Sequence, residues 1–220
     1  MYQKYIKRII DIIVSAIAIP FLLPVWLVIA IAIKMDSKGP IFFNQERIGK
    51  DKKPFKMFKF RSMNCLDYEM NMDEKHDYSY TRVGNIIRKV SVDETPQFLN
   101  VLKGDMSLIG PRPDVQTHVN DMTLEHLERH VVVPGITGLA QTDDSFGLDF
   151  VKTYDLDVEY VKNIRFNSDF LIALKTAKYA IGRNNAMRSK EQIEELWQKY
   201  LEYAEKIARL KPEESDKFSL

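Results

Sequence analysis

The sequence predicts an α+β protein that is mostly helical, with an N-terminal membrane-embedded helix and a compact domain after it. Three observations support this class: an uncharged run near the N-terminus, two short strand-like segments after it, and helical patterns through most of the remainder. A chain of 220 residues is long enough for one well-formed core with appendages. We expect the membrane helix at 1–38, the compact domain with its short strands and surface amphipathic helices at 39–183, and an amphipathic helix and tail at 184–220.

The run Ile12–Ile33, IIVSAIAIPFLLPVWLVIAIAI, contains no charged residue. At about 1.5 Å per residue, a helix of this length reaches roughly 33 Å, enough to cross the apolar core of a bilayer. The run is too long for the apolar part of a cleavable signal peptide, and no small-residue cleavage site follows it. It therefore predicts a membrane-embedded helix.

Two topologies are open for this helix. Pro20 and Pro24 lie in its middle, and each proline removes an amide donor and clashes with the carbonyl one turn earlier. Basic residues flank the run on both sides: Lys4, Lys7 and Arg8 before it, and Lys34 and Lys38 after it. Because positive charge favours the cytoplasmic face, a helix that enters and returns on one face would suit both flanks. A kinked spanning helix also tolerates its prolines, so the residues alone favour neither topology.

Two strand-like segments come next, Ile41–Gln45 and Phe55–Phe60, on either side of a turn that contains RIGKDKK. The polar and acidic segment 66–80 predicts a loop. Short helices are expected at 81–90, 156–164 and 169–179, with a glycine-punctuated loop at 134–141.

The tail 189–210 carries apolar residues at helical spacing and predicts an amphipathic helix. Such a helix could pack on the core, on a second copy of the chain in a homodimer, or on the membrane surface. Packing on the core or in a dimer is favoured, because it is the commoner arrangement.

A further helix is expected at Pro96–Leu102, with Thr95 as its N-cap and the proline at its first position. A capping box that starts at Ser91, with Glu94 three residues later, is the alternative. The Thr95 start is preferred because a proline disfavours the helical conformation in the residue before it. Gly104 is expected to end the helix.

Two features on either side of this helix suggest phosphate chemistry. Asp93 and Glu94 lie at its N-terminus, which carries partial positive charge and attracts carboxylates and phosphates alike. Arg112 stands between two prolines in GPRP, so its planar guanidinium is offered from a rigid backbone. Helix-start acids and surface turns are common when each occurs alone. Together, after a membrane anchor, they favour chemistry on phosphate at a bilayer surface.

Charge and cysteine content exclude several other classes. The 32 Lys and Arg residues nearly balance 31 Asp and Glu residues, which argues against a nucleic-acid binder. The single cysteine cannot form an internal disulfide, and its use suits a reducing compartment. Metal-binding spacings of Cys and His are missing from the sequence. We expect structural or surface roles for its histidines, which are His76, His118, His126 and His130.

The chain resembles a known family, the monotopic phosphoglycosyl transferases, also called bacterial sugar transferases. The resemblance lies in five segments that follow one another over residues 4–165: KRIIDIIVS, FKMFKFRSM, VDETPQFLNVLKGDMSLIGPRP, PGITGLAQ and YDLDVEYVKN. The part of the third segment from Asp93 to Pro113 is close to diagnostic.

The resemblance implies a reaction and its partners. Such proteins transfer a sugar-1-phosphate from a UDP-sugar to a polyprenyl phosphate such as undecaprenyl phosphate, release UMP and use Mg²⁺. They initiate glycoconjugate and polysaccharide biosynthesis. The implied location is the bacterial inner membrane, with the catalytic domain on the cytoplasmic face, membrane lipids as partners and no nucleic acid.

The resemblance also implies roles for particular residues. Asp93 would be the nucleophile, forming a covalent phosphosugar-aspartyl intermediate, and would contact the metal. Glu94 would assist it by positioning or proton handling. Lys59, Arg112 and Asp157 would bind substrate.

For the membrane helix, the resemblance places the helix break at Pro24 and implies the re-entrant topology. One departure concerns specificity: many relatives continue after GLAQ with Val-Asn-Gly-Arg-Asn, whereas this chain has TDDSFGLDF, with acidic Asp143 and Asp144. The sugar is therefore left open. An inactive membrane-docked scaffold or sugar-nucleotide sensor is the alternative function, and the retained site residues argue against it.

Overall fold

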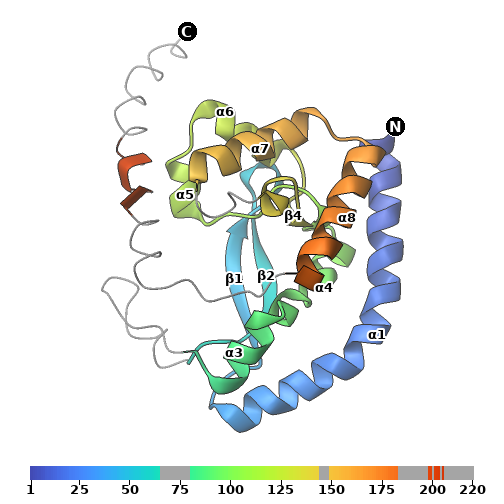
Figure 1. Ribbon diagram of the computed structural model, residues 1–220, viewed down its shortest axis with the longest axis vertical. Helices are drawn as coiled ribbons and strands as arrows, with labels where there is room; N and C mark the ends of the chain where they lie inside the picture. Colours follow the sequence, from blue (N-terminus) through green and yellow to red (C-terminus); the bar gives the residue numbers. More distant parts are fainter. Residues whose placement is uncertain (65–79, 144–148, 183–197, 200, 204, 206–220) are drawn as a thin grey trace.

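The computed structural model describes residues 1–64, 80–143, 149–182, 198–199, 201–203 and 205. A long N-terminal helix curves along one side of a domain built from a β-hairpin, a second small sheet and several helices (Figure 1). The predicted class, mostly helical with a small amount of sheet, is confirmed. The predicted loop at 66–80 lies outside the described residues, apart from Tyr80.

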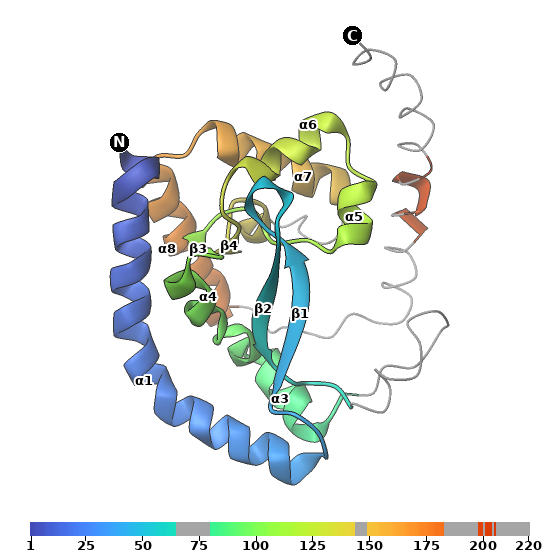
Figure 2. The same cartoon turned by 180° about the vertical axis from the view of Figure 1, so that it is seen from behind.

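The apolar helix α1 spans Lys7–Asp36, preceded by a π-helical turn at Tyr2–Ile6. It runs without interruption through Pro20 and Pro24, so the predicted break is a bend instead, and Figure 2 shows the helix as a wide arc. Ile19 and Leu22, which lie beside the prolines, pack against the buried cluster that contains Trp26. The segment Tyr2–Asp36 is long and apolar enough to cross a membrane.

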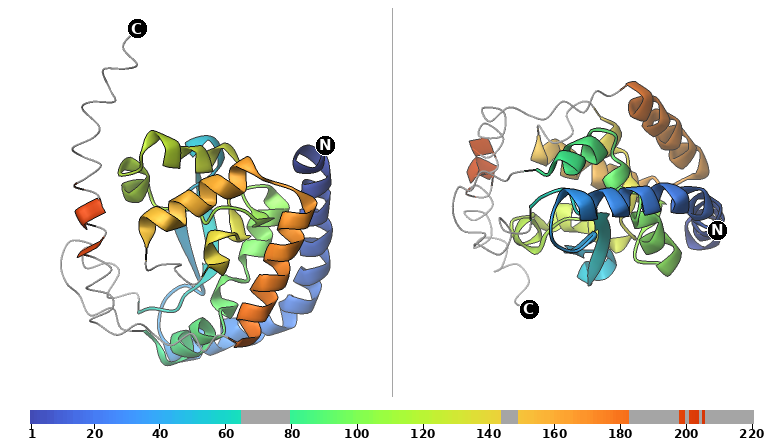
Figure 3. Two further views of the ribbon diagram at one scale, coloured as in Figure 1. Left: turned by 45° about the horizontal axis from the view of Figure 1, so that its top comes forward. Right: turned by 90° about the horizontal axis from the view of Figure 1, so that it is seen from below.

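The two faces of α1 meet different surroundings. Trp26, Ile29 and Ile33 are buried against the domain. Large apolar side chains cover the opposite face and are exposed, among them Ile17, Phe21, Leu27 and Val28. An apolar face of this size is suited to lipid rather than to water. At the N-terminal end, Lys7 forms a 2.6 Å ion pair with Asp169 of α8 (Phe166–Gly182), which runs beside α1 (Figure 3).

Strands β1 (Phe42–Ile48) and β2 (Pro54–Phe60) form an antiparallel hairpin, which confirms both predicted strands and extends the first. Phe42 pairs with Phe60 at one end of the hairpin and Ile48 pairs with Pro54 at the other. The turn between them bends sharply because Asp51 and Lys52 have positive φ. This register places Lys59 near the open end of β2.

Helix α3 (Arg82–Lys89) confirms the short helix predicted there, with Thr81 as its N-cap. A 3₁₀ turn, Val92–Glu94, then leads into α4 (Gln97–Lys103), which ends at Gly104 with φ 99° as predicted. The predicted start of α4 was wrong. Pro96 occupies the cap position, and the Thr95 hydroxyl donates to the Val92 carbonyl at 2.7 Å instead of capping the helix.

The physical reason for the different start is that Thr95 already has helical backbone angles (φ −60°, ψ −27°). Its hydroxyl is held by two hydrogen bonds, one of them from Trp26 on α1. These contacts outweigh the preference of a residue before proline for extended backbone. Asp93 and Glu94 therefore lie inside a 3₁₀ turn that continues directly into α4.

A second sheet pairs β3 (Ser107–Ile109) with β4 (Gly135–Thr137) in parallel. The predicted loop at 134–141 was thus wrong in part, since it contains β4 and most of a 3₁₀ turn, Ala140–Thr142. Gly135 is needed because a Cβ there would lie 2.1 Å from the Gly110 amide nitrogen. The strand is only three residues long, too short for its alternation to be visible in the sequence.

The remaining helices are α5 (Gln116–Asn120), α6 (Leu124–Leu127), α7 (Phe150–Lys162) and α8. The first two were not predicted, because elements this short carry little periodicity. The predicted helices 156–164 and 169–179 are confirmed, although both begin earlier. α7 starts at an N-cap, Asp149, whose side chain accepts from the Lys152 amide.

The described part of the C-terminal tail includes Tyr203, which is buried in a cluster with Ile48, Val119, Met122 and Tyr154. Its hydroxyl lies 2.9 Å from His126 Nδ1. Packing on the core, one of the two favoured arrangements, is therefore confirmed at this residue. The rest of the predicted helix 189–210 lies mostly outside the described residues.

The three histidines that the structure describes have structural surroundings, as expected. His126 Nε2 lies 2.9 Å from the Asp155 carboxylate, and His118 Nδ1 lies 2.7 Å from the Asp114 carboxylate. His130 is buried beside Arg129, and burial and that positive charge lower its pKa to about 4. His76 lies outside the described residues.

Candidate active site

Glu94 and Arg112 form the exposed side of the candidate site. The two Arg112 terminal nitrogens lie 2.9 and 3.4 Å from the Glu94 carboxylate oxygens, so the pair is bidentate. Lys59 Nζ lies 3.3 Å from Glu94 Oε1. The Arg112 guanidinium holds the pKa of Glu94 well below its usual range, with a smaller contribution from Lys59, and burial only partly offsets this. Glu94 is therefore a carboxylate at any physiological pH.

Asp93 lies deeper, 2% exposed, and forms an ion pair with Lys59 at 2.8 Å between Oδ2 and Nζ. Lys59, which lies on β2, thus contacts both of the neighbouring carboxylates. Within the described residues, Asp93 Oδ2 is close to this ammonium but has no hydrogen bond of good geometry. A buried carboxylate beside a single ammonium keeps further lone pairs that can attack phosphorus or bind a metal.

Arg112 is held from behind by a buried second arginine. Arg129 Nη2 donates to the Arg112 carbonyl at 2.7 Å and to Asp157 Oδ2 at 2.6 Å. Arg129 Nη1 donates to Asp114 Oδ2 at 3.1 Å. Two groups from the loop after β3 and one from α7 therefore converge on one guanidinium, which ties the Arg112 backbone to α7.

The structure brings four of the five predicted polar site residues into direct contact: Lys59, Asp93, Glu94 and Arg112. Asp157 is different. It is fully buried on α7 and reaches the site through Arg129 and the Arg112 carbonyl. In this arrangement Asp157 supports the Arg112 backbone, while its predicted contact with substrate stays a prediction.

Sequence reasoning missed Arg129 and Asp114, and also Arg47 on β1. Burial and the nearby Arg112 charge lower the pKa of Arg47, whose guanidinium donates to the Gln45 side chain. Asp114 directly follows GPRP, so its position next to Arg112 was a usable signal. Arg129 offered none, because one buried arginine looks like any other cation in a chain with 32 Lys and Arg residues.

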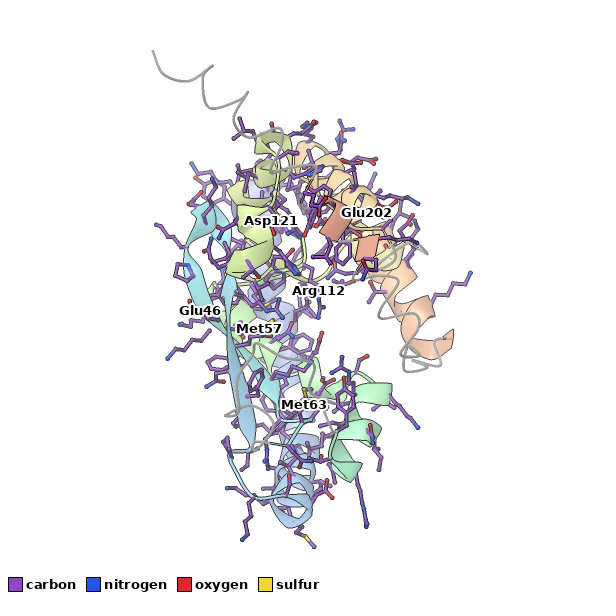
Figure 4. All side chains as sticks on the ribbon, turned by 90° about the vertical axis from the view of Figure 1, so that its left-hand side faces the viewer. Glu46, Met57, Met63, Arg112, Asp121 and Glu202 are labelled. Atoms are coloured by element: carbon purple, nitrogen blue, oxygen red, sulfur yellow. The ribbon has the colours of Figure 1, made fainter. Side chains whose placement is uncertain are left out.

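The site is accessible to ligand. The Arg112 and Glu94 side chains are 36% and 23% exposed, whereas Asp93 lies behind them. Figure 4 shows Arg112 between the upper helices, where Asp121 is labelled, and the lower part of the domain, where Met63 is labelled. A substrate phosphate that approaches from solvent would meet the exposed Arg112 side chain before it reaches the buried Asp93.

The donor set suits Mg²⁺ only with help from a substrate. Among the residues that the structure describes, His, Cys, Asp and Glu side chains form no group of three or more that could hold a metal ion. Mg²⁺ is commonly held by one or two carboxylates together with substrate phosphates and water. Asp93, with its Oδ2 free of a well-formed hydrogen bond among the described residues, fits such a partial site.

The raised pKa of Asp157 makes a testable prediction. Burial raises this pKa from 3.8 to about 6, although Arg129 opposes the shift and Asp114 adds to it. Because the folded protein then holds this proton more tightly than the unfolded chain, the contribution of Asp157 to the free energy of unfolding falls as pH rises from about 4 to 6. Chemical unfolding in detergent at several pH values measures this contribution when the wild type is compared with a variant that lacks the Asp157 proton.

Asp157→Asn is the matching variant, because it removes the titrating proton and keeps the side-chain shape. The difference between wild-type and variant unfolding free energies should change across that pH range, while opposite contributions from acids with lowered pKa, such as Glu94, cancel in the difference. A difference that is constant with pH would contradict the prediction.

Several curated relatives and one family model match this chain. A curated relative from Aeromonas hydrophila, a UDP-N-acetylgalactosamine-undecaprenyl-phosphate N-acetylgalactosaminephosphotransferase, is 43% identical over 182 residues, which are 79% of this chain and 43% of the relative. A UDP-glucose:undecaprenyl-phosphate glucose-1-phosphate transferase from Caulobacter vibrioides is 36% identical over 192 residues, 82% of this chain and 71% of the relative.

Another relative, an uncharacterised sugar transferase from Bacillus subtilis, is 40% identical over 146 residues, 66% of this chain and 72% of that protein. The chain spans about two fifths of the length of several of the curated relatives, including the one from Aeromonas hydrophila. The family model for bacterial sugar transferases matches residues 2–183, which include the apolar helix and every residue of the site. The chain therefore belongs to the bacterial sugar transferase family.

Proposed function

We propose that this chain transfers a sugar-1-phosphate from a UDP-sugar to undecaprenyl phosphate at the cytoplasmic face of a bacterial inner membrane, with release of UMP. The observation that carries the proposal is the cluster of two adjacent carboxylates, Asp93 and Glu94, with two cations, Lys59 and Arg112. Thr95, which directly follows the turn that holds the carboxylates, contacts the apolar helix. Names of the relatives support both the donor class and the acceptor.

In the first step, an Asp93 oxygen attacks the phosphorus that carries the sugar. A new bond forms between the carboxylate oxygen and that phosphorus, and the bond to the bridging oxygen breaks, so UMP leaves with that oxygen. Asp93 then holds the phosphosugar as an acyl phosphate. Covalent catalysis of this kind divides one transfer into two steps with lower barriers.

The attack requires charge neutralisation, because both reactants are anionic. Two unit charges about 4 Å apart repel by roughly 4 kcal/mol at an effective dielectric constant near 20. Arg112 and Lys59 stand where they can bind the diphosphate oxygens, and Glu94 orients both cations. Asp93 would help to hold Mg²⁺, which would supply further positive charge near the leaving group.

In the second step, an oxygen of undecaprenyl phosphate attacks the same phosphorus and frees the Asp93 carboxylate. The acceptor is embedded in lipid, so the site must lie close to the membrane surface. Two contacts between α1 and the site region support a site close to the membrane surface. Trp26 contacts Thr95, and Arg8 contacts the carbonyls at the end of α4.

The decisive experiment measures UMP release by purified protein with undecaprenyl phosphate, Mg²⁺ and a panel of UDP-sugars. The panel must be broad, because the names of the relatives include both N-acetylgalactosamine and glucose donors. Turnover with at least one donor is expected. Failure across the panel would favour the inactive scaffold or sugar-nucleotide sensor.

We also propose that α1 is re-entrant, with both ends on the cytoplasmic face. The bend of α1 and the basic residues at both of its ends support this topology. Single cysteines at Met1 and Ser37, in a Cys65→Ser background, should both react with a membrane-impermeant maleimide added from the cytoplasmic side. Labelling of the two positions from opposite sides would mean a spanning helix.

A further inference from the structure

Trp26 joins the apolar helix to the turn that carries the site acids. Its indole Nε1 donates to the Thr95 hydroxyl at 2.9 Å, and its side chain is buried. Thr95 follows Glu94 directly, and its hydroxyl donates in turn to the Val92 carbonyl at 2.7 Å. One hydroxyl therefore links the membrane helix to both ends of the turn that holds Asp93.

The same indole also contacts the strand that carries the site lysine. Trp26 packs edge-on against Phe60, with ring centroids 6.4 Å apart. Phe60 follows Lys59 directly and is 1% exposed, in a cluster completed by Ile29, Ile33 and Ile87. A single side chain on α1 thus touches the neighbours of Glu94 and of Lys59.

Arg8 holds the opposite end of α4. Its guanidinium donates to the carbonyls of Val101 and Leu102 in the last turn of α4, where the Val101 carbonyl also accepts from the Gly104 amide. Arg8 and Trp26 are separated by roughly 27 Å along a straight helix, whereas the seven residues from Thr95 to Leu102 span only about 10 Å. The curvature of α1 around the domain (Figure 2) brings both of its contacts to this short stretch.

We propose that Trp26 is a positioning residue through which the lipid-embedded helix sets the placement of Asp93 relative to Lys59. The inference rests on the proposed function for its kinetic readout. A shift of α1 in the bilayer would move Thr95 through the indole N–H, and would move Phe60 through the ring. The consequence is an active site whose geometry depends on correct insertion of α1.

The test uses variants that remove the hydrogen bond and keep the packing. Trp26→Phe retains an aromatic ring and loses the N–H donor, and Thr95→Val retains the shape and loses the hydroxyl. With full-length protein in nanodiscs, each should lower kcat about tenfold, because a displaced Asp93 attacks from a poorer geometry, with KM for the UDP-sugar within about twofold. Thr95→Ser keeps the hydroxyl and should restore kcat.

The double variant decides whether the two residues act together. If they do, Trp26→Phe should lower kcat little further in the Thr95→Val background, because the bond is already absent. Additive losses, or an unchanged kcat in both single variants, would overturn the proposal. Ile29→Val is the matched control, because it weakens the same buried cluster without removing a polar contact.

Amide hydrogen exchange provides a readout that needs no substrate. Trp26→Phe should speed exchange in residues 92–98, and Ile29→Val should not. Equal exchange in these two variants would overturn the proposal even if turnover cannot be measured. Absence of turnover in the wild type, by contrast, would count against the proposed function and leave the exchange result to decide the role of Trp26.

Discussion

Asp93→Asn is expected to abolish UMP release, lowering turnover by at least about a thousandfold, because an amide cannot form the acyl phosphate. The variant should fold normally, since Lys59 keeps its ion pair with Glu94. Intact mass spectrometry provides the direct measurement. Wild-type protein mixed with donor, without acceptor, should gain the mass of one phosphosugar, located on residue 93 by peptide mapping.

The matched control is Asp105→Asn, which makes the same chemical change beyond the other end of α4. Asp105 pairs with Lys103 at 3.0 Å, away from the four contacting site residues. Turnover in this variant should stay close to that of the wild type. Substantial activity in Asp93→Asn, or an adduct that persists there, would rule out Asp93 as the nucleophile.

Three of the site residues that the structure brings into contact carry short-range signals in the sequence. Asp93 and Glu94 were found from their place before a helix, and Arg112 was found from its flanking prolines. The contact of Lys59 with both acids joins residues 34 and 35 positions apart, and it was expected through the family resemblance rather than from local physics. Local rules reach only a few residues along the chain.

The parts that were missed depend on the tertiary structure. Thr95 was expected to cap α4, but a hydrogen bond from Trp26, 69 positions away in the sequence, and another to Val92 hold its hydroxyl elsewhere. The break expected at Pro24 is a bend, because packing on one face keeps α1 continuous. In both cases a distant contact outweighs a local preference of about 1–3 kcal/mol.

Asp157 is another residue whose contacts could not be predicted from the sequence near it. Its sequence motif marked it as a site residue, and the structure places it beneath the site. The residue that connects it to Arg112 is Arg129, 28 positions earlier, and no local pattern identifies a buried cation. A motif can thus identify a residue that matters without identifying the contacts through which it acts.

The support beneath Arg112 leads to the second large prediction. Arg129→Ala should lower the free energy of unfolding by about 3–5 kcal/mol, because it leaves a buried carboxylate without its partner. Asp157 loses its ion pair and Asp114 loses one of its partners. Chemical unfolding in detergent measures the effect. Donor turnover should also fall, since the Arg112 carbonyl loses its hydrogen bond from Arg129.

Two comparisons separate this buried network from an ordinary ion pair. Lys162→Ala removes an exposed lysine that pairs with Glu125 and Glu128 at 3.5 and 3.4 Å, and it should leave the unfolding midpoint unchanged. Adding Asp157→Asn to Arg129→Ala should recover part of the lost stability, because it removes the unpaired buried charge. The prediction is contradicted if Arg129→Ala is no more destabilising than Lys162→Ala. That result would mean that the buried network does not hold Arg112, and that only Pro111 and Pro113 make its backbone rigid.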